Sequence, residues 1–201
     1  AGGRGHTAEN AGKIFDLVDF FAGYGFNKSH SAAYALITYQ TGYLKARFPV
    51  ELLCGIMTSD KGRIDKVVRT IADARAMGVT VLPPDVNESD IDFKVVYKFP
   101  EGNKKVSRAD KSAVAKDPYG PQIRFGLGAV RGLGGAALEA LLEARNEGGP
   151  FTDLFDFASR VDAKRVNKGV FEALVQCGAF DSTLFPRGIS RAQAFASIET
   201  A

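Results

Sequence analysis

The stretch that decides the fold is VRGLGGAALEALLEAR, residues 130–145. In it a short apolar segment leads to two glycines, Gly132 and Gly134, which flank Leu133 and are followed by an Ala- and Leu-rich helical pattern. Glycine lets the backbone turn tightly and leaves consecutive N–H groups accessible. The following helix adds the positive end of its dipole at the same place. The stretch therefore predicts a turn that can hold one phosphate group without contacting a base.

This turn resembles the helix-hairpin-helix motif, which binds the backbone of duplex DNA irrespective of sequence. One departure from that motif is Leu138, at a position where a small residue is often found. The departure bears on how tightly the two helices pack and leaves the hairpin itself unaffected. The residues that we expect to contact DNA are Arg131, Gly132, Leu133, Gly134 and Gly135.

Two other interpretations of the turn remain open from the residues alone. Gly132, Gly134 and Ala137 also match the loose dinucleotide-binding fingerprint. That fingerprint needs a second apolar strand ending in an acid about 20 residues on, whereas residues 151–160 have a helical pattern. The third interpretation is a glycine-rich turn that only connects packed helices.

The rest of the chain alternates between helical patterns and one short region of strands. Apolar spacing and end signals predict helices over residues 8–22, 29–47, 50–59 and 63–77, with Thr7 as a cap and Gly23 as a stop. In the fourth helix the expected core residues are Ile64, Val67, Val68, Ile71, Ala72 and Met77.

A short strand is expected before Pro83, a second within residues 91–99 and a third at residues 123–125. Further helices are expected in FTDLFDFASRV, in NKGVFEALVQCG and within residues 182–201. The predicted fold class is mainly α with a small β element (α+β). We expect three regions, at residues 1–90, 91–125 and 126–201.

A second candidate site lies at the start of the helix expected over residues 29–47. Lys28, Ser29, His30 and Ser31 crowd a cation, two hydroxyls and an imidazole onto a helix entrance. Together with the unpaired amides of the first turn, these groups suit a polyphosphate. The alternative is a capped helix whose Lys28 and His30 are merely exposed while the rest of the helix is buried.

Residues 100–121 are polar and basic, without periodicity, and predict a loop between two strands. The alternative to a phosphate-binding role is a solvated insertion. The cations of this stretch and its edge that can reach phosphate are Lys104, Lys105, Arg108, Lys111, Lys116 and Arg124.

Composition excludes several classes of protein. The 201 residues are 45% apolar and 24% charged, with a net charge of +3, so any DNA-binding charge must be local. Cys54 and Cys177 have no ligand spacing and predict reduced, buried thiols; with only His6 and His30 beside them, no Cys/His metal site is expected. The sequence shows neither a membrane span nor a signal peptide. The glycine-rich opening favours a piece of a longer protein.

Long stretches of the chain resemble one family in order. They are KIFDLVDFFAGYGFNKSHSAAYALITYQTGYLKARFPVE (13–51), LPPDVN (82–87), FGLGAVRGLGGAALEALLEARNEGGPFTDLFDF (125–157) and VNKGVFEALVQCGAFD (166–181). They are similar to the alpha subunit of bacterial DNA polymerase III, a replicative polymerase. The resemblance covers residues 9–181.

The resemblance implies a function for both candidate sites. Residues 1–90 would be the later part of the fingers domain, with Lys28, Ser29, His30 and Ser31 holding the incoming triphosphate. In that role Lys28 would stabilise the leaving pyrophosphate and His30 would donate a hydrogen bond or a proton. Residues 126–201 would be the helix-hairpin-helix region that holds product duplex.

It also implies partners and a location. The expected partners are duplex primer-template DNA, an incoming dNTP and, through regions outside this chain, replisome subunits including the sliding clamp. No membrane partner is implied, and the expected location is cytoplasmic. The parent reaction would be template-directed nucleotidyl transfer with Mg²⁺ held elsewhere.

Two features of the family are missing from this sequence. The acid pairs Asp16/Asp19 and Asp153/Asp156 lie in helical patterns and are interpreted as solvated helix faces, so no catalytic or metal-binding residue is expected here. The stretch at residues 193–195 is a poor match to a clamp-binding motif. We therefore expect this chain alone to be inactive. A stand-alone DNA-binding module and a purely structural scaffold segment remain the alternatives.

Overall fold

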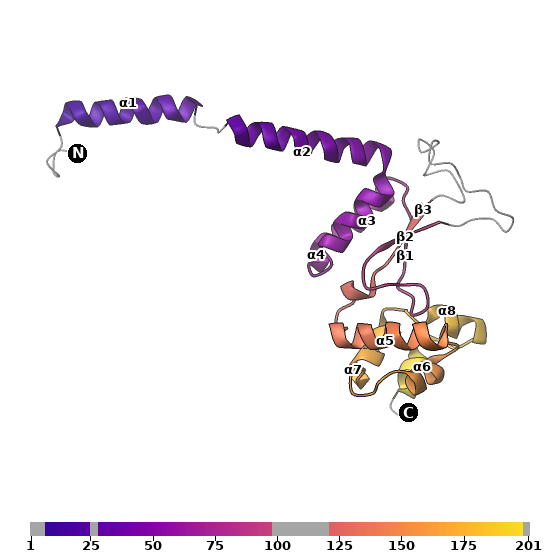
Figure 1. Cartoon of the computed structure of the whole chain (residues 1–201). Helices are drawn as coiled ribbons and strands as arrows, with labels where there is room; N and C mark the ends of the chain where they lie inside the picture. Colours follow the sequence, from indigo (N-terminus) through magenta and orange to yellow (C-terminus); the bar gives the residue numbers. More distant parts are fainter. Residues whose placement is uncertain (1–6, 25–27, 98–120, 199–201) are drawn as a thin grey trace. The chain divides into compact units, whose positions relative to one another are not determined.

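The computed structural model describes residues 7–24, 28–97 and 121–198 (Figure 1). The contacts divide the chain into two compact units, Ala1–Leu44 and Lys45–Ala201. The region boundaries expected at residues 90 and 125 stay predictions.

The first unit is built from helix α1 (Ala8–Tyr24) and most of helix α2 (Lys28–Arg47). The cap predicted for α1 is confirmed, because the Asn10 amide donates to Thr7 Oγ1 at 3.3 Å. Both helices were predicted from their sequence patterns to within two residues at each end.

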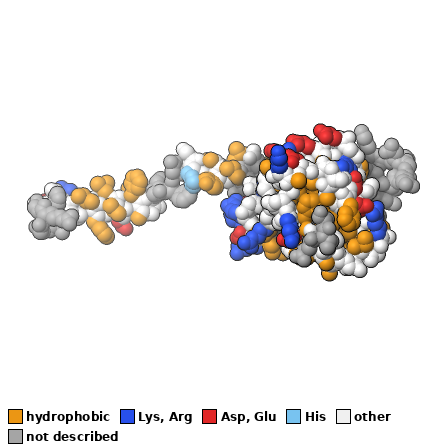
Figure 2. All heavy atoms as spheres, turned by 90° about the horizontal axis from the view of Figure 1, so that it is seen from below, with side chains coloured by type: hydrophobic (Ala, Val, Ile, Leu, Met, Phe, Trp, Pro, Cys, Tyr) orange, Lys and Arg blue, Asp and Glu red, His pale blue; other side chains and the backbone are white. Residues whose placement is uncertain are grey.

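The apolar side chains of α1 and α2 are exposed rather than buried. Phe20 and Phe21 are about 70% exposed, and α2 has no buried residue. Figure 2 shows hydrophobic side chains on the visible surface of these helices. The expectation that α2 is buried beyond its first turn is therefore wrong for this chain, because no described element covers it.

Helix α3 (Pro49–Ser59) and helix α4 (Ile64–Ala76) open the second unit. Proline at the first position of α3 suits a helix start, because its fixed φ is helical. Proline lacks an N–H, but an N–H at this position would have no partner within the helix. Gly78, with φ +76°, closes α4 as predicted. The helix pair then leads into a small sheet.

The sheet has three strands, β1 (Val81–Leu82), β2 (Lys94–Tyr97) and β3 (Pro121–Arg124). Strand β3 lies in the middle, parallel to β1 and antiparallel to β2. Ile123 pairs with Val81 on one side and with Val95 on the other and is fully buried. The sheet therefore joins residues from 24 to 42 positions apart.

One core forms between α3, α4 and the sheet. On α4 it contains Val67 and Ala74, with Thr70 buried on the same face, while Ile64 and Val68 are 56% and 58% exposed. The prediction that Ile64 and Val68 belong to the core is thus wrong, because α4 contacts the core along the line through Val67, Thr70 and Ala74. This sheet core consists of Val50, Leu53, Cys54, Met57, Val67, Ala74, Val79, Phe93, Ile123 and Ala129.

The remaining chain is helical. A 3₁₀ turn, η3 (Leu127–Ala129), precedes the long helix α5 (Gly135–Gly148). Figure 1 shows α5 running across this part, close to the shorter helices. These are α6 (Leu154–Arg160), α7 (Lys168–Gln176), α8 (Asp181–Leu184), the 3₁₀ turn η4 (Phe185–Arg187) and α9 (Arg191–Ser197).

The centre of this helical core is Phe157, which is fully buried on α6. Its ring meets those of Phe151, Phe171 and Phe180 edge to face, at centroid distances of 4.9, 5.1 and 5.2 Å. Such pairs add about 0.5–1.5 kcal/mol each beyond the area they bury. The aromatic cluster thus joins α6, α7 and the start of α8 into one body.

The predicted fold class, mainly α with a small β element, is confirmed. Within residues 7–24, 28–97 and 121–198, each helix lacks the length or the apolar content that a bilayer crossing needs.

Candidate nucleic-acid interface

The glycine-rich turn links η3 to α5. The Val130 amide donates to Leu127 O at 3.0 Å and ends η3, and Gly132 then adopts a φ of +94°, which favours glycine. Gly134 is the N-cap of α5, with φ −80° and ψ 159°, and has no side chain to cap the helix. The first amides of α5 consequently point out of the helix end, as in any α-helix that lacks a side-chain cap.

The outer side of the turn is open. Gly132, Gly134 and Gly135 are exposed, and a Cβ added at Gly134 or Gly135 would meet nothing within 4 Å. A ligand can therefore approach the backbone at the start of α5 more closely than a side chain there would permit. Among the described residues beside it, Arg131 is exposed and carries a positive charge.

The inner side of the turn is packed. Leu133 contacts the helical core, and Leu138 is only 5% exposed within that core. Leu133, which is partly buried, therefore anchors the turn on the core, and its predicted contact with DNA stays a prediction. The bulky Leu138, at a position where a small residue is common, is accommodated by the core.

A second turn, residues 161–167, lies beside the first and was not singled out from the sequence. Arg165 Nε donates to Ala136 O at 3.1 Å, and a Cβ on Gly132 would lie 3.5 Å from the Cβ of Ala173 on α7. The second turn thus lies against the start of α5, and the first turn packs on α7, so that the two turns are neighbours on one face. The available signal was Asn167, whose side chain accepts from the Val170 amide at 3.1 Å and caps α7.

Cations on this face differ in their availability. Arg165 is held by Glu139 at 3.2 Å and Glu143 at 2.5 Å. The hydrogen bond with Glu143 raises the pKa of Arg165 above its usual value. Arg165 therefore fastens the second turn to α5, whereas Arg131 and Lys164 are exposed and suited to phosphate.

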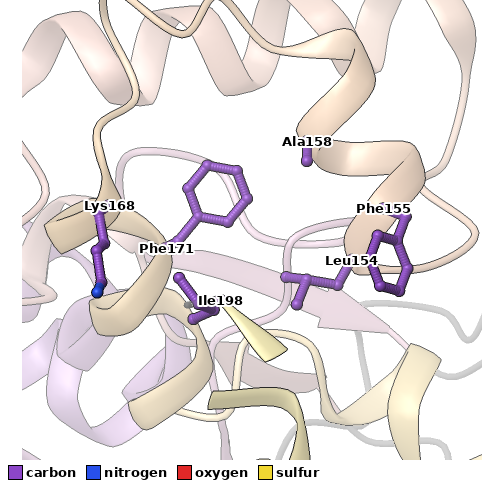
Figure 3. Close-up of a pocket in the computed structure, with 6 residues that line it drawn as sticks. All are labelled: Leu154, Phe155, Ala158, Lys168, Phe171 and Ile198. Carbon is purple, nitrogen blue, oxygen red and sulfur yellow. The ribbon is translucent and has the colours of Figure 1, made fainter. Parts of the chain in front are cut away.

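A hollow of about 260 Å³ lies between α6, α7 and the end of α9 (Figure 3). Its lining is apolar except for Lys168, whose Nζ lies 3.9 Å from Glu172. An apolar lining does not suit phosphate. The lining residues are Leu154, Phe155, Ala158, Lys168, Phe171 and Ile198.

The other candidate site lies in the first turn of α2. Lys28, Ser29, His30 and Ser31 are all helical and exposed, and the rings of His30 and Tyr34 lie 4.2 Å apart. The helix begins at Lys28, one residue before the start that was predicted. Its role in binding a triphosphate stays a prediction.

The basic loop falls mostly outside the described residues, as do Lys104, Lys105, Arg108, Lys111 and Lys116. Arg124 is described and does not fit a phosphate-binding role. Its guanidinium pairs with Glu88 and donates to Pro83 O at 3.0 Å, and its side chain is only 12% exposed. Arg124 therefore joins β3 to the segment after β1.

The acid pairs have different surroundings. Asp16 and Asp19 are exposed on α1, as predicted. Asp153 instead accepts from the Asp156 amide at 2.8 Å and caps α6, while Asp156 pairs with Arg160 at 3.1 Å. The interpretation of this second pair as a solvated face is wrong, because both carboxylates are engaged at the helix start.

Other sequence features also have structural partners. Gln193 forms a capping box with Ser190 at the start of α9.

Cys54 and Cys177 are free thiols, and burial, assisted by Glu51 and Asp92, raises the pKa of Cys54 to about 11. Cys177 is only partly buried. In the part of the chain that the structure describes, no group of three or more His, Cys, Asp or Glu residues is placed to hold a metal ion.

Comparison with known proteins bears on the open turn. The model of the helix-hairpin-helix motif matches residues 78–194, more than half of the chain. The chain belongs to the helix-hairpin-helix family. The match includes both turns of the face described above and the sheet that precedes them.

Curated relatives extend the comparison to nearly the whole chain. It is 45% identical over 197 residues to the DNA polymerase III subunit alpha of Vibrio cholerae, covering 98% of this chain and 15% of the relative. Those of Thermus aquaticus and Escherichia coli K12 are each 45% identical, over 179 and 177 residues (89% and 88% of this chain), with 13% of each relative covered. The predicted resemblance is confirmed. The helix-hairpin-helix chain spans about one seventh of these relatives' length.

Proposed function

We propose that this chain is a segment of a bacterial replicative DNA polymerase, and that its helix-hairpin-helix holds duplex DNA by the phosphate backbone. The observation that carries the proposal is the open turn at Gly134 and Gly135, where helix-start amides are exposed with no side chain above them. Amides and a helix dipole bind a phosphate without reading a base. Binding would therefore be independent of sequence.

The surrounding charge supports the same partner. Arg131 and Lys164 are exposed on the face shared by the two turns, next to the helix starts. Two turns on one face suit two phosphates of a duplex. In this proposal the chain contributes contacts to duplex DNA, while nucleotidyl transfer and the Mg²⁺ ions belong to other parts of the polymerase. The polymerase works in the cytoplasm with the sliding clamp and other replisome subunits.

The test measures binding of the full chain to a random-sequence duplex by fluorescence anisotropy over a range of salt. We expect log affinity to fall linearly with log salt, because each phosphate contact releases counterions. We expect Gly134→Val to weaken binding by about tenfold, the value of one lost charge-assisted hydrogen bond. The φ of −80° and the empty space at Gly134 allow the variant to fold.

Gly55→Val on α3 is the matched control, since a Cβ there also meets nothing within 4 Å. It should bind like the wild type. Equal affinity at low and high salt, or unchanged binding by folded Gly134→Val, would contradict the proposal. Absence of any binding would favour a scaffold segment.

We also propose that the first turn of α2 contacts the triphosphate of the incoming nucleotide. The exposed cluster at residues 28–31 supports it, because a helix start with a nearby ammonium suits phosphate. In a full-length polymerase that carries this segment, Lys28→Ala should raise the KM for nucleotides or lower kcat. Unchanged steady-state kinetics would refute this contact.

A further inference from the structure

Residues 85–92, which we call the bridging segment, lie between β1 and β2 and bond to the chain just before the hairpin turn. The Leu127 amide donates to Asp90 O and the Gly128 amide to Ile91 O, both at 2.9 Å. Ser89 Oγ donates to Phe125 O at 2.7 Å. The entrance to the hairpin is thus bonded along the bridging segment.

The same segment also bonds to α5, the helix after the turn. Arg145 donates to Val86 O at 3.1 Å, to Ser89 O at 2.6 Å and to Asp90 Oδ1 at 3.1 Å, with its side chain 14% exposed. One planar guanidinium therefore connects α5 to three positions of the bridging segment.

Asn87 makes a further connection beyond α5. Its side-chain amide donates to Phe151 O at 2.9 Å, and its Oδ1 accepts from the Phe151 amide at 2.7 Å. Phe151 belongs to the aromatic cluster of the helical core. The bridging segment is consequently tied to the turn's entrance, to α5 and to the core on which the turn packs.

The bridging segment is itself well ordered by internal bonds. Asp85 Oδ1 accepts from the Asn87 amide at 2.8 Å and from the Glu88 amide at 3.2 Å. The Asp85 amide donates to Ser89 Oγ at 3.0 Å, and both residues are buried. A segment with its polar groups paired inside can serve as a rigid support.

We propose that the bridging segment sets the position of the hairpin amides, and that Asn87 and Arg145 are positioning residues for phosphate binding. This inference rests on the proposed duplex-binding function. Neither residue belongs to the open turn, and both act by holding the two sides of the hairpin at a fixed separation. A binding site requires its donors to be held to within about 0.5 Å.

The test uses the full 201-residue chain and two variants that preserve charge. Asn87→Ala removes both bonds to Phe151, and Arg145→Lys removes the fork while keeping the cation. Three quantities are measured: the ¹H–¹⁵N shifts of the Gly132, Gly134 and Gly135 amides without DNA, the affinity for a random duplex at fixed salt, and Tm. The control is Ser190→Ala, which weakens the α9 cap and leaves the bridging segment unchanged.

We expect both positioning variants to move the hairpin glycine shifts and to weaken DNA binding by about tenfold, since small displacements of donors are costly. Ser190→Ala should lower Tm while leaving those shifts and the affinity as in the wild type. If the folded variants keep wild-type glycine shifts and affinity, the bridging segment is only a structural support and the positioning role is overturned. If the wild type itself does not bind duplex DNA, the proposed function fails and the positioning role fails with it.

Discussion

At the scale of single residues, glycine stands at the positions around the hairpin for different physical reasons. A Cβ on Gly126 would lie 2.6 Å from the carbonyl carbon of Asp92, so the backbone there leaves no room for a side chain. Gly132 needs its positive φ. At Gly134 and Gly135 the chain itself imposes neither constraint, and close approach by a ligand is the reason that we propose for them.

Gly126→Ala and Gly135→Ala should therefore differ in their effects on stability. We expect Gly126→Ala to lower the free energy of unfolding by about 1–3 kcal/mol, because rigid backbone must move to admit the methyl group. Gly135→Ala should be neutral or stabilising by up to about 1 kcal/mol, since alanine is the better helix former. Urea unfolding followed by circular dichroism measures both. Equal effects of the two substitutions would contradict the conclusion that Gly126 is sterically required and Gly135 is not.

At the scale of elements, the short helices depend on their ends. Helices α6, α7 and α9 have only seven to nine residues, and isolated helices of that length are marginal in water. Each has a polar side chain that accepts from its first turn: Asp153, Asn167 and Ser190. At the other end of α5, Arg160 donates to Ala144 O and Gly149 O, both at 2.7 Å. Caps and core packing together therefore stabilise this region.

The cap of α6 makes stability depend on pH. The Asp156 amide and then Arg187, whose guanidinium lies 2.7 Å from the carboxylate, hold the pKa of Asp153 below its usual value. A lowered folded-state pKa contributes stability above the unfolded pKa of about 3.9, and this contribution is lost as pH falls through the folded value. Asp153→Ala should cost about 1 kcal/mol at pH 7, and its difference from the wild type should shrink below about pH 4.

The measurement is the free energy of unfolding at pH 7, 5 and 3 for the wild type and for Asp153→Ala. Asp73→Ala is the control, because Asp73 is exposed on α4 away from any helix start. It should change stability little at each pH. A cost of Asp153→Ala that is the same at pH 7 and pH 3 would rule out the carboxylate as the cause.

At the scale of the whole molecule, the two units differ in how they are stabilised. Both apolar cores are built from residues after Leu44, from Val50 to Ala194. The described residues of Ala1–Leu44 belong to neither core and expose their large apolar side chains. Cooperative stability therefore belongs to Lys45–Ala201.

Removing residues 1–44 should leave the thermal unfolding of the remaining chain nearly unchanged. We expect a Tm within about 2 °C of the full chain, because a shift of 1 kcal/mol moves Tm by only about 2–4 °C in a domain of this size. The helical signal should fall at low temperature, since α1 and most of α2 are lost. Differential scanning calorimetry and far-ultraviolet circular dichroism measure the two quantities. A Tm lower by 10 °C would show that the first unit supports the core.

Much of the local structure was predictable from the sequence. The starts and ends of α3 and α4, the strand near Val81 and the glycine turn before α5 follow from signals within a few residues. The buried face of α4 was predicted only in part. Ile64 and Val68 continue its apolar stripe, yet they are exposed because the core contacts the line through Val67 and Ala74.

The sequence by itself determined the helices, the glycine turn at residues 132–135 and the family, because caps, glycines and motifs are read within short stretches of the chain. Only the tertiary structure decided that β3 lies between β1 and β2, that Arg165 joins a second turn to α5, and that Arg145 fastens α5 to the bridging segment. These contacts join residues from 22 to 59 positions apart. Their choice depends on which apolar surfaces can be buried together, which no short stretch of sequence encodes.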